Sequence, residues 1–268
     1  MILSNQLPAN FQRLTEEDQA QYETELCFLS PPTSADPKCE VKKQKWLQWR
    51  AAPYPDNRHS EYLSIPEKDS ECDSNRILVS AIMHTPRCIE EYILAQPRKN
   101  RYDLAGKKAL ARGYVASQIR PNNNSEEIWE IIHSSDKRQG RAIAPRYWER
   151  AQNYSFPDYE EYSDPYYQDI CCGVFSPTGQ LVAYLLGKRV GHHVQYDEIM
   201  GHSEHLQNDV MYLLHYHFLK LSCAAEIPPK WLNYGPWYSG TNPYCSSGGL
   251  NRWKRKVGFH PAYLILAS

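Results

Sequence analysis

The chain contains 268 residues, of which 41% are hydrophobic and 12% aromatic. That is enough to bury the core of one large domain or of two small ones. Its 30 basic and 31 acidic residues give a formal net charge of −1. A charge so close to zero excludes a surface devoted as a whole to nucleic acid or to an anionic membrane, so any anion site is expected to be local.

The amino-terminal stretch MILSNQLPANFQRL has no basic segment followed by an apolar one, and no apolar run in the chain is long enough to cross a bilayer. The eight cysteines include no CxxC pair and are too sparse for a small disulfide-stapled scaffold. We therefore expect a soluble, cytoplasmic protein with reduced thiols and no membrane partner.

Residues 1–84 predict an N-terminal extension or a small subdomain. Residues 14–29 fit an amphipathic helix, with Thr15 as N-cap and acidic residues in the first turn. Residues 30–75 are rich in proline, serine and charged residues, which predicts irregular structure or short strands. The run RILVSAIMH, residues 76–84, predicts a strand because it is short, apolar and partly β-branched.

Residues 85–268 have the alternating pattern of an α/β domain. The helix at 122–140 takes Asn124 or Ser125 as its cap, and its apolar residues follow helical spacing. The predicted elements are helices over 87–96, 101–114 and 122–140, a hairpin over 169–190, a strand over 192–202, a helix over 207–222, a strand over 230–236, a basic turn at 252–256 and a short closing strand. The fold class is therefore a mixed central sheet flanked by helices, with an irregular N-terminal extension.

Six segments follow one another in a recognisable order: EEYILAQPRKNRYDLAGKKALARGY, SEEIWEIIHSSDKRQGR, GVFSPTGQLVAYLLG, VMYLLHYHFLKL, LNYGP and GGLNRWKRKVGFHP. Together they resemble a single acyltransferase module of the GNAT superfamily, in its FemAB-like branch, over roughly residues 85–262. The closing segment is the most specific. That branch typically ends with a glycine, an apolar residue, an aromatic-lysine pair and a Gly-Phe, here Gly249, Leu250, Trp253-Lys254 and Gly258-Phe259.

The resemblance implies transfer of an acyl or aminoacyl group onto an amine by direct attack. It implies Lys254 as the group that stabilises an oxyanion or a phosphate, because the resembling enzymes use this lysine at the reacting centre. It also implies a carboxylate base on the strand at 192–202, where Asp197 and Glu198 follow Tyr196. Strand alternation would point Asp197 and Glu198 to opposite faces, so at most one of them would face the cleft.

The donor site is expected in two segments. The superfamily's glycine-rich phosphate loop would fall in GHSEHLQND, residues 201–209, where Gly201 is the only glycine. The missing glycines count against coenzyme A, whereas the near-zero net charge counts against an extensive tRNA footprint. The resemblance implies acyl-CoA or an aminoacyl-tRNA as donor, and we slightly favour acyl-CoA because single-module GNAT proteins mostly use it. The candidate donor-binding residues are Arg252, Arg255, Lys256, Gln207 and Asn208.

The acceptor is expected to be a small-molecule or peptide amine. Its candidate binding residues are Arg138, Arg141, Tyr147 and Trp253. Arg138 and Arg141 either pair with a carboxylate or phosphate of a substrate, or cap the C-terminus of a helix that we expect to end at Gly140. Residues 156–169 fit an exposed connector or a lid over the acceptor cleft.

Histidine and cysteine raise two further possibilities. Six of the ten histidines lie between 192 and 217, but no HExxH or paired Cys/His spacing is present, so no metal is expected. His202 or His205 is an alternative acid or base near the donor loop. Cys171 and Cys172 are adjacent on a predicted strand, which puts one thiol on each face and favours a structural role for both.

Two alternative functions remain open. One is an aminoacyl-tRNA-dependent transferase of the FemAB-like kind. The other is a noncatalytic nucleic-acid-binding protein on a degenerate GNAT fold, in which residues 252–256 and 98–112 form a basic patch. Salt-dependent binding of RNA or DNA without acyl turnover would favour the second alternative. A further interpretation of the basic residues at 252–256 is that they form a solvated surface with no binding role.

Overall fold

In the computed structural model, the described residues are 25–29, 34–51, 79–138, 141–143, 145–156, 159, 164–237 and 248–266. Thr15 and most of the predicted helix at 14–29 lie outside these residues, as do Gln139 and Gly140. Within them no helix is long and apolar enough to cross a membrane.

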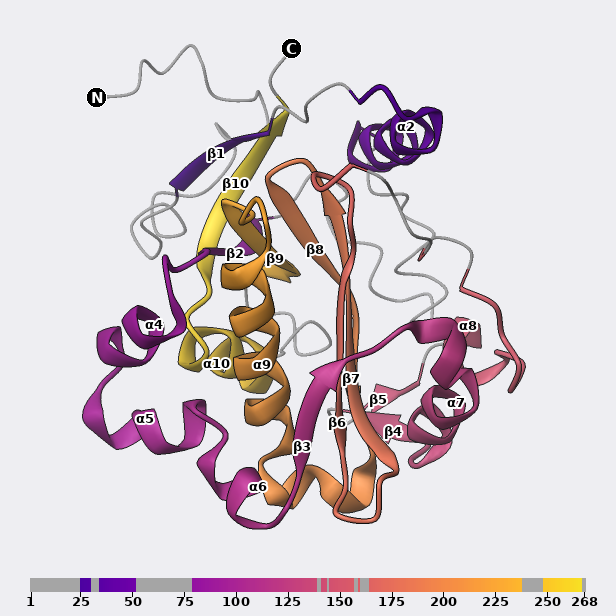
Figure 1. Ribbon diagram of the computed structural model, residues 1–268, viewed down its shortest axis with the longest axis vertical. Helices are drawn as coiled ribbons and strands as arrows, with labels where there is room; N and C mark the ends of the chain where they lie inside the picture. The colour runs from indigo at the N-terminus through magenta and orange to yellow at the C-terminus, as the bar shows by residue number, and fades with distance from the viewer. Residues whose placement is uncertain are drawn as a thin grey trace, which may run out of the picture.

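One mixed sheet organises the molecule (Figure 1). Its strand order is β1-β10-β2-β9-β8-β7-β6-β3. The pairs β1/β10 and β8/β9 are parallel, and the other neighbours are antiparallel. The strands are β1 (Glu25–Leu29), β2 (Val79–His84), β3 (Val115–Gln118), β6 (Ile170–Phe175), β7 (Leu181–Val190), β8 (His193–Gly201), β9 (Trp231–Trp237) and β10 (His260–Leu266).

Helices cover both faces of this sheet, as the sequence predicts (Figure 1). Helix α9 (Val210–Ala224) packs on β6, β7 and β8, and α7 (Ser125–His133) packs on β7 and β8. Leu185 belongs to the core on the α9 side, whereas the next residue, Leu186, belongs to the core on the α7 side. The other helical segments are α2 (Pro37–Ala51), α4 (Ile89–Ala95), α5 (Arg98–Leu104), α6 (Lys107–Ala111), η3 (Pro121–Asn124), α8 (Pro145–Trp148), η4 (Ser203–Asn208) and α10 (Gly248–Lys256).

The adjacent cysteines follow the same alternation. Cys172 packs in the core beside α9, and its thiol contacts the Leu214 carbonyl oxygen at 3.7 Å. Cys171 packs in the core beside α7. Burial raises the pKa of both thiols well above its usual value, so both remain protonated and unreactive at neutral pH. The expected placement of one thiol on each face is confirmed.

Two expectations for the N-terminal segment are wrong. Residues 25–29 form β1 rather than the end of a helix, because they pair with β10 from Glu25↔Ala262 to Leu29↔Leu266. Within the stretch predicted to be irregular, residues 37–51 form α2. The Asp36 carboxylate accepts a hydrogen bond from the Lys38 amide at 2.9 Å, and Pro37 is the first helical residue. Both features are typical of a helix N-terminus, although the proline-rich composition of this stretch indicated irregular structure.

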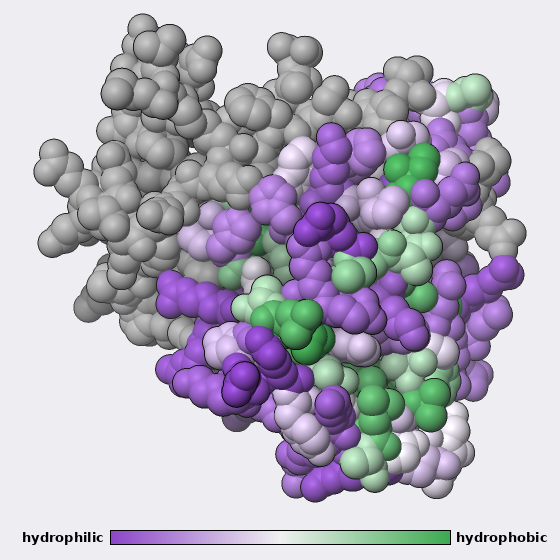
Figure 2. Space-filling model, turned by 60° about the vertical axis from the view of Figure 1, so that its left-hand side comes forward, coloured by the Kyte–Doolittle hydropathy of each residue, from purple (hydrophilic) through white to green (hydrophobic). Residues whose placement is uncertain are grey.

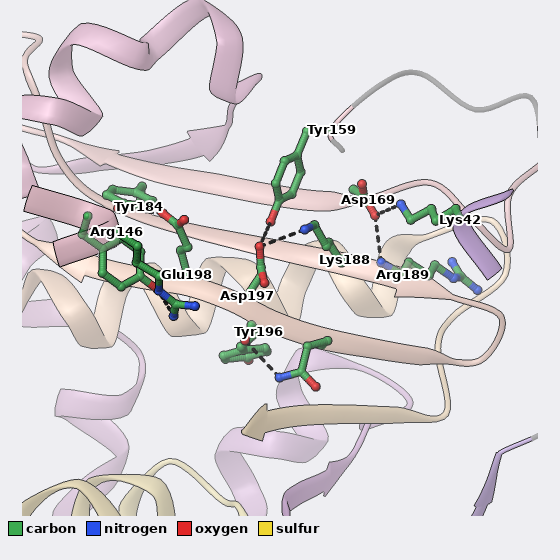
Figure 3. Close-up of polar contacts among 12 residues, drawn as sticks. Lys42, Arg146, Tyr159, Asp169, Tyr184, Lys188, Arg189, Tyr196, Asp197 and Glu198 are labelled. Atoms are coloured by element: carbon green, nitrogen blue, oxygen red, sulfur yellow. Dashed lines mark hydrogen bonds and ion pairs between the residues drawn. The ribbon is translucent and has the colours of Figure 1, made fainter. Parts of the chain in front are cut away.

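Helix α2 is fastened to the sheet by a buried ion pair. The Lys42 ammonium contacts the Asp169 carboxylate, and it donates to the Tyr167 carbonyl at 3.2 Å. The same carboxylate accepts the Arg189 amide at 2.8 Å (Figure 3). Burial raises the pKa of Asp169 to about 6. Residues from the expected N-terminal extension therefore pack on the sheet through α2, and β1 and β2 are themselves strands of that sheet.

Three other segments differ from the sequence prediction. The helix expected at 101–114 is split into α5 and α6 by Gly106, whose φ is 65° and where a Cβ would lie 2.6 Å from the Leu213 Cα atom. Helix α7 ends at His133 instead of Gly140, and the hairpin β4 (Lys137–Arg138) and β5 (Arg141–Ala142) follows. The basic residues at 252–256 lie in α10 and not in a turn.

The surface on the side of α4, α5 and α6 is mostly hydrophilic (Figure 2). Its described hydrophobic residues form separate areas and not one continuous patch. Leu94, Tyr102 and Leu110 are the large exposed ones on these three helices. Single exposed apolar side chains of this kind are normal for a protein surface.

The close packing of α9 on β7 gives a stability prediction. A Cβ at Gly187 would lie 2.8 Å from the Phe218 ring and 2.7 Å from the Ile170 carbonyl oxygen. We expect Gly187→Ala to lower the free energy of unfolding by about 1–3 kcal/mol, measured by urea denaturation. Gly179→Asn is the control, since nothing lies within 4 Å of that Cβ and Asn tolerates its φ of 86°. Equal stability of Gly187→Ala and the wild type would contradict this packing.

Candidate active site

The sheet opens between β8 and β9. These parallel strands pair at His193↔Trp231, Val194↔Leu232 and Gln195↔Asn233, although β8 continues to Gly201 and β9 to Trp237. Gly235 in β9 has a φ of 69°, and its amide donates to the Asn233 side chain at 2.9 Å. The backbone of β9 therefore turns away from β8 directly after the last pair.

A β-bulge lies at the same level on β8. In the register with β7, Leu186 faces Glu198 and Gly187 faces Tyr196, so Asp197 is an extra residue on β8. The bulge interrupts the alternation of side chains. The expectation that Asp197 and Glu198 point to opposite faces is therefore wrong, because both side chains line one cleft.

This cleft has a volume of about 440 Å³. One wall is β8, and the other comes from α8 and the residues that follow it. Its lining residues are Arg146, Tyr147, Glu149, Arg150, Ala151, Tyr154, Asp197 and Glu198. Three of the sequence candidates, Tyr147, Asp197 and Glu198, are therefore brought together here.

Glu198 is held by a buried ion pair. Arg150 approaches the carboxylate with both terminal nitrogens, Nη1 at 3.0 Å from Oε2 and Nη2 at 2.5 Å from Oε1. The Tyr184 hydroxyl donates to Oε2 at 3.2 Å. The Arg150 guanidinium also lies over the rings of Tyr154 at 4.6 Å and Phe156 at 5.2 Å. These contacts engage both oxygens of Glu198, so its charge is neutralised by Arg150 within the wall of the cleft.

Asp197 is the more accessible carboxylate. Its side chain is 38% exposed, and Oδ2 accepts the Tyr159 hydroxyl at 3.0 Å and the Lys188 ammonium at 3.1 Å (Figure 3). Burial and the nearby Asp197 charge raise the pKa of Tyr159, so this phenol remains a donor at neutral pH. Asp197 therefore combines a defined position with access to the cleft.

Lys254 on α10 lies beside β9, on the α9 side of the sheet. Its side chain is 1% exposed, and its Nζ atom lies 4.9 Å from the centre of the Tyr234 ring on β9. Burial lowers the pKa of Lys254 to about 7. At neutral pH this amine is therefore divided between its charged and neutral forms, and a nearby anion would favour the charged one.

Tyr196 also faces the α9 side. Its ring packs on Phe218 at 4.7 Å and on Tyr234 at 5.1 Å, and its hydroxyl lies 3.2 Å from His215 Nδ1. His215 Nε2 lies 3.2 Å from the Val257 carbonyl, which can only accept, so Nε2 carries the proton. Burial lowers the pKa of His215 to about 4, so the ring is neutral and the Tyr196 hydroxyl donates to Nδ1. Tyr196 is thus tied into the core and does not line the cleft.

Three of the candidate donor-binding residues, Lys256, Gln207 and Asn208, lie near the first turn of α9. On α10, Trp253 packs on Tyr212 at 4.7 Å, and the Lys256 ammonium lies 4.6 Å from the same ring. Arg252 and Arg255 are exposed on α10. On the other side, α6 contributes Lys108, which donates to the Gln207 carbonyl at 3.1 Å, and Arg112, which contacts Asn208. Basic side chains from two helices therefore flank this helix N-terminus.

Arg138 has a structural task. It donates to the Gly201 carbonyl oxygen at 2.7 Å and also contacts the Ile131 carbonyl at the end of α7. The interpretation as a cap of a helix ending at Gly140 is wrong in position, but the side chain does satisfy carbonyl groups of the preceding helix. Arg141 lies on β5, and its side chain is outside the described residues.

Arg150, Tyr159 and Lys188 are not among the site residues that the sequence predicts. Their roles depend on which residue of β8 they meet, and that depends on the bulge at Asp197. The only sequence signal was the mixture of arginine and aromatic residues in RYWERAQNYSF, residues 146–156, which is typical of stacked guanidinium groups.

No family model matches the sequence, and no curated protein matches it either. The structural neighbours are proteins with the GNAT fold. The chain is similar to a crystal structure of FemX, with 12% identity over 69% of this chain and 60% of that one, and a TM-score of 0.48.

Two further structures are similar over 69% of this chain. L-PGS from Bacillus licheniformis is 13% identical over 59% of its own length, with a TM-score of 0.42. A GCN5-related N-acetyltransferase from Kribbella flavida is 11% identical over 54% of its length, with a TM-score of 0.34. The chain therefore spans less than two thirds of the length of each of these structures.

The buried ion pair predicts a structural role for Glu198. The Arg150 and Glu198 side chains are 8% and 9% exposed, so Glu198→Gln leaves a nearly buried guanidinium without its carboxylate. We expect a loss of about 3 kcal/mol in the free energy of unfolding, measured by urea denaturation. Glu91→Gln on α4 is the matched control, because it removes the same charge from the exposed pair with Arg87 and should leave the transition unchanged. An equal effect of both substitutions would refute the buried pair.

The low pKa of Lys254 predicts a pH-dependent stability. Between pH 7 and the pKa of the unfolded chain, this amine is protonated in the unfolded chain but mostly neutral in the folded chain. The free energy of unfolding therefore rises with pH over this range. In Lys254→Met this contribution is absent. We expect the unfolding free energy of the wild type, relative to Lys254→Met, to increase by about 2 kcal/mol between pH 7 and 9. A difference that stays constant over this range would show that the amine is not buried.

Proposed function

We propose that the protein is an acyltransferase that moves an acyl or aminoacyl group from an activated donor onto an amine. The observation that carries this proposal is the bulge at Asp197 beside the opening of the sheet. The bulge supports the proposal because an accessible carboxylate lines the cleft there. The second group is the buried Lys254, which lies beside Tyr234 on β9, the strand that forms the other edge of the opening.

The acceptor amine lies in the cleft beside Asp197. A carboxylate there attracts an ammonium group, and it accepts the proton that the amine must lose before it can attack, directly or through one water. The Tyr159 hydroxyl and Lys188 hold Asp197 in place. The ring of Tyr147 supplies an apolar wall, and the Arg150–Glu198 pair keeps that wall rigid.

The reaction is a direct attack. The amine nitrogen forms a bond to the carbonyl carbon of the donor and gives a tetrahedral intermediate with an oxyanion. Lys254 stabilises this charge, since a negative group nearby favours the protonated form of an amine whose pKa is about 7. The bond to the leaving group then breaks. The thiolate of coenzyme A or the ribose oxygen of tRNA leaves and takes up a proton.

The donor's phosphates lie at the N-terminus of α9. This helix has 15 residues, and its first turn is flanked by Lys108 and Arg112 on one side and by Lys256 on the other. A helix N-terminus with basic neighbours favours phosphate groups. Among donors we favour acyl-CoA over aminoacyl-tRNA, because the chain's net charge of −1 suits a local phosphate site better than a long polyanion.

A substitution at Asp197 tests the proposed base. Asp197→Asn keeps the size and most hydrogen bonds but removes the proton acceptor, so we expect transfer to fall by at least about a hundredfold. The measurement is release of coenzyme A or of free tRNA in the presence of an amine acceptor panel, with the fold checked by circular dichroism. Glu91→Gln on α4 lies outside the cleft and should retain full turnover. Full activity of Asp197→Asn would refute the proposed base.

Ligand-induced thermal stabilisation identifies the donor. The purified protein is heated with acetyl-CoA, longer acyl-CoAs, and charged or uncharged tRNA at one low salt concentration. We expect a rise in melting temperature with an acyl-CoA, and a smaller rise when Lys108 and Arg112 are both changed to Ala. A rise with charged tRNA alone would assign an aminoacyl donor. A rise with any RNA or DNA, without acyl turnover, would support the nucleic-acid-binding alternative.

A further inference from the structure

Two histidines and a glutamate meet where β8 passes into α9. His202 follows the last residue of β8, and Glu204 and His205 lie in η4, which leads into α9. One ligand atom of each side chain lies within 4.8 Å of the corresponding atoms of the other two. His202 and His205 are half-buried, and Glu204 is exposed. The helical turn of η4 thus collects side chains that the sequence spacing did not mark as a metal motif.

The separation of these atoms suits a metal ion after small side-chain rotations. Nitrogen and oxygen ligands lie about 2.0–2.2 Å from zinc, so ligand atoms in a tetrahedral site are about 3.3–3.6 Å apart. The observed upper limit of 4.8 Å therefore requires a closure of roughly 1.5 Å at most. The two rings are 5.4 Å apart and inclined by 71°, so neither blocks the approach of the other to a common point.

The ring of His205 is held by an outer set of hydrogen bonds. Its Nδ1 lies 2.8 Å from the Tyr114 hydroxyl, and the Asn208 amide donates to the same hydroxyl at 2.7 Å. Arg112 in turn contacts the Asn208 carbonyl oxygen, which orients that amide. Metal-binding histidines typically have their second nitrogen fixed in this way, and Nε2 of His205 then remains for a metal.

His202 is held less firmly. Its Nδ1 accepts the Glu204 amide at 3.4 Å, which is at the long end of hydrogen bonding. The ring can therefore turn towards His205 at little cost. The Ser203 hydroxyl donates to the Ser134 carbonyl at 2.6 Å, which fixes the backbone between the two histidines to the end of α7. The backbone of the cluster is thus rigid, and the adjustment falls on side chains.

We propose that His202, Glu204 and His205 bind one divalent transition-metal ion, with zinc the ion best matched to two imidazoles and a carboxylate. Three protein ligands leave a position of a tetrahedral ion for water or for an anion. The site lies beside Asn208 and Arg112, at the N-terminus of α9. It does not depend on the proposed transfer reaction, and its test needs no turnover.

Zinc titration of the full-length protein tests the site. The protein is dialysed against a chelator, the chelator is removed, and ZnCl2 is added in competition with a chromophoric indicator. We expect one ion per chain, and a loss of affinity of at least about a hundredfold in His202→Ala and in His205→Ala. Tyr114→Phe keeps the ligands but removes the outer hydrogen bond, and should weaken binding about tenfold. Cobalt(II) should give the absorption bands of a tetrahedral site.

The control is His84→Asn, which removes an exposed histidine outside the cluster and should leave zinc affinity unchanged. Circular dichroism of each metal-free variant separates a lost ligand from a lost fold, and Tyr114→Phe retains its packing in the core. Less than one ion per chain in the wild type would overturn the proposal. So would zinc affinity that is the same in the double variant His202→Ala, His205→Ala as in the wild type.

Discussion

The incomplete pairing of β8 with β9 is the constraint on which the candidate site depends. Two parallel strands that stayed in register would satisfy each other's backbone groups and close the sheet. Here the register ends at Gln195↔Asn233, and Gly235 bends β9 in a conformation that other residues rarely adopt. Beyond this pair, the backbone groups on the facing edges of β8 and β9 do not pair with each other, so they are available to bind another group. Asp197, the proposed base, lies two residues beyond this end of pairing, and Tyr234, beside Lys254, directly follows it on β9.

The bulge on β8 adds a second consequence to the opening. It turns two consecutive carboxylates towards one cleft, and their surroundings then give them different tasks. Glu198 meets a nearly buried arginine and a tyrosine hydroxyl, which use both of its oxygens. Asp197 keeps more than a third of its surface exposed and meets a lysine and a tyrosine through one oxygen. Environment rather than residue type thus separates the structural carboxylate from the proposed base.

Periodicity of the sequence predicted most of the elements but not their register. Alternating or helical spacing predicts the hairpin at 170–190, the strand β8 and the helix α9. Each of these elements buries a large apolar face, and that burial leaves a clear period in the sequence. Residues 25–29 form a strand because they pair with β10, more than 230 residues away in the sequence. A local sequence pattern cannot predict such a long-range pairing. The same holds for Asp197 and Glu198, since one extra residue in β8 reverses the face that alternation assigns.

Lys254 illustrates how a charge-rich sequence can conceal a buried group. The neighbouring Arg252 and Arg255 are exposed, yet Lys254 is 1% exposed because it lies on the inner face of α10. Helical spacing places Lys254 on a different face from the arginines, whereas the turn predicted for residues 252–256 did not separate them into two faces. A fully charged lysine is costly to bury, and the lowered pKa of Lys254 measures that cost. A negative charge brought close to Lys254 and Tyr234 would offset it, so the same burial that weakens the free protein would favour the anionic intermediate of the proposed transfer.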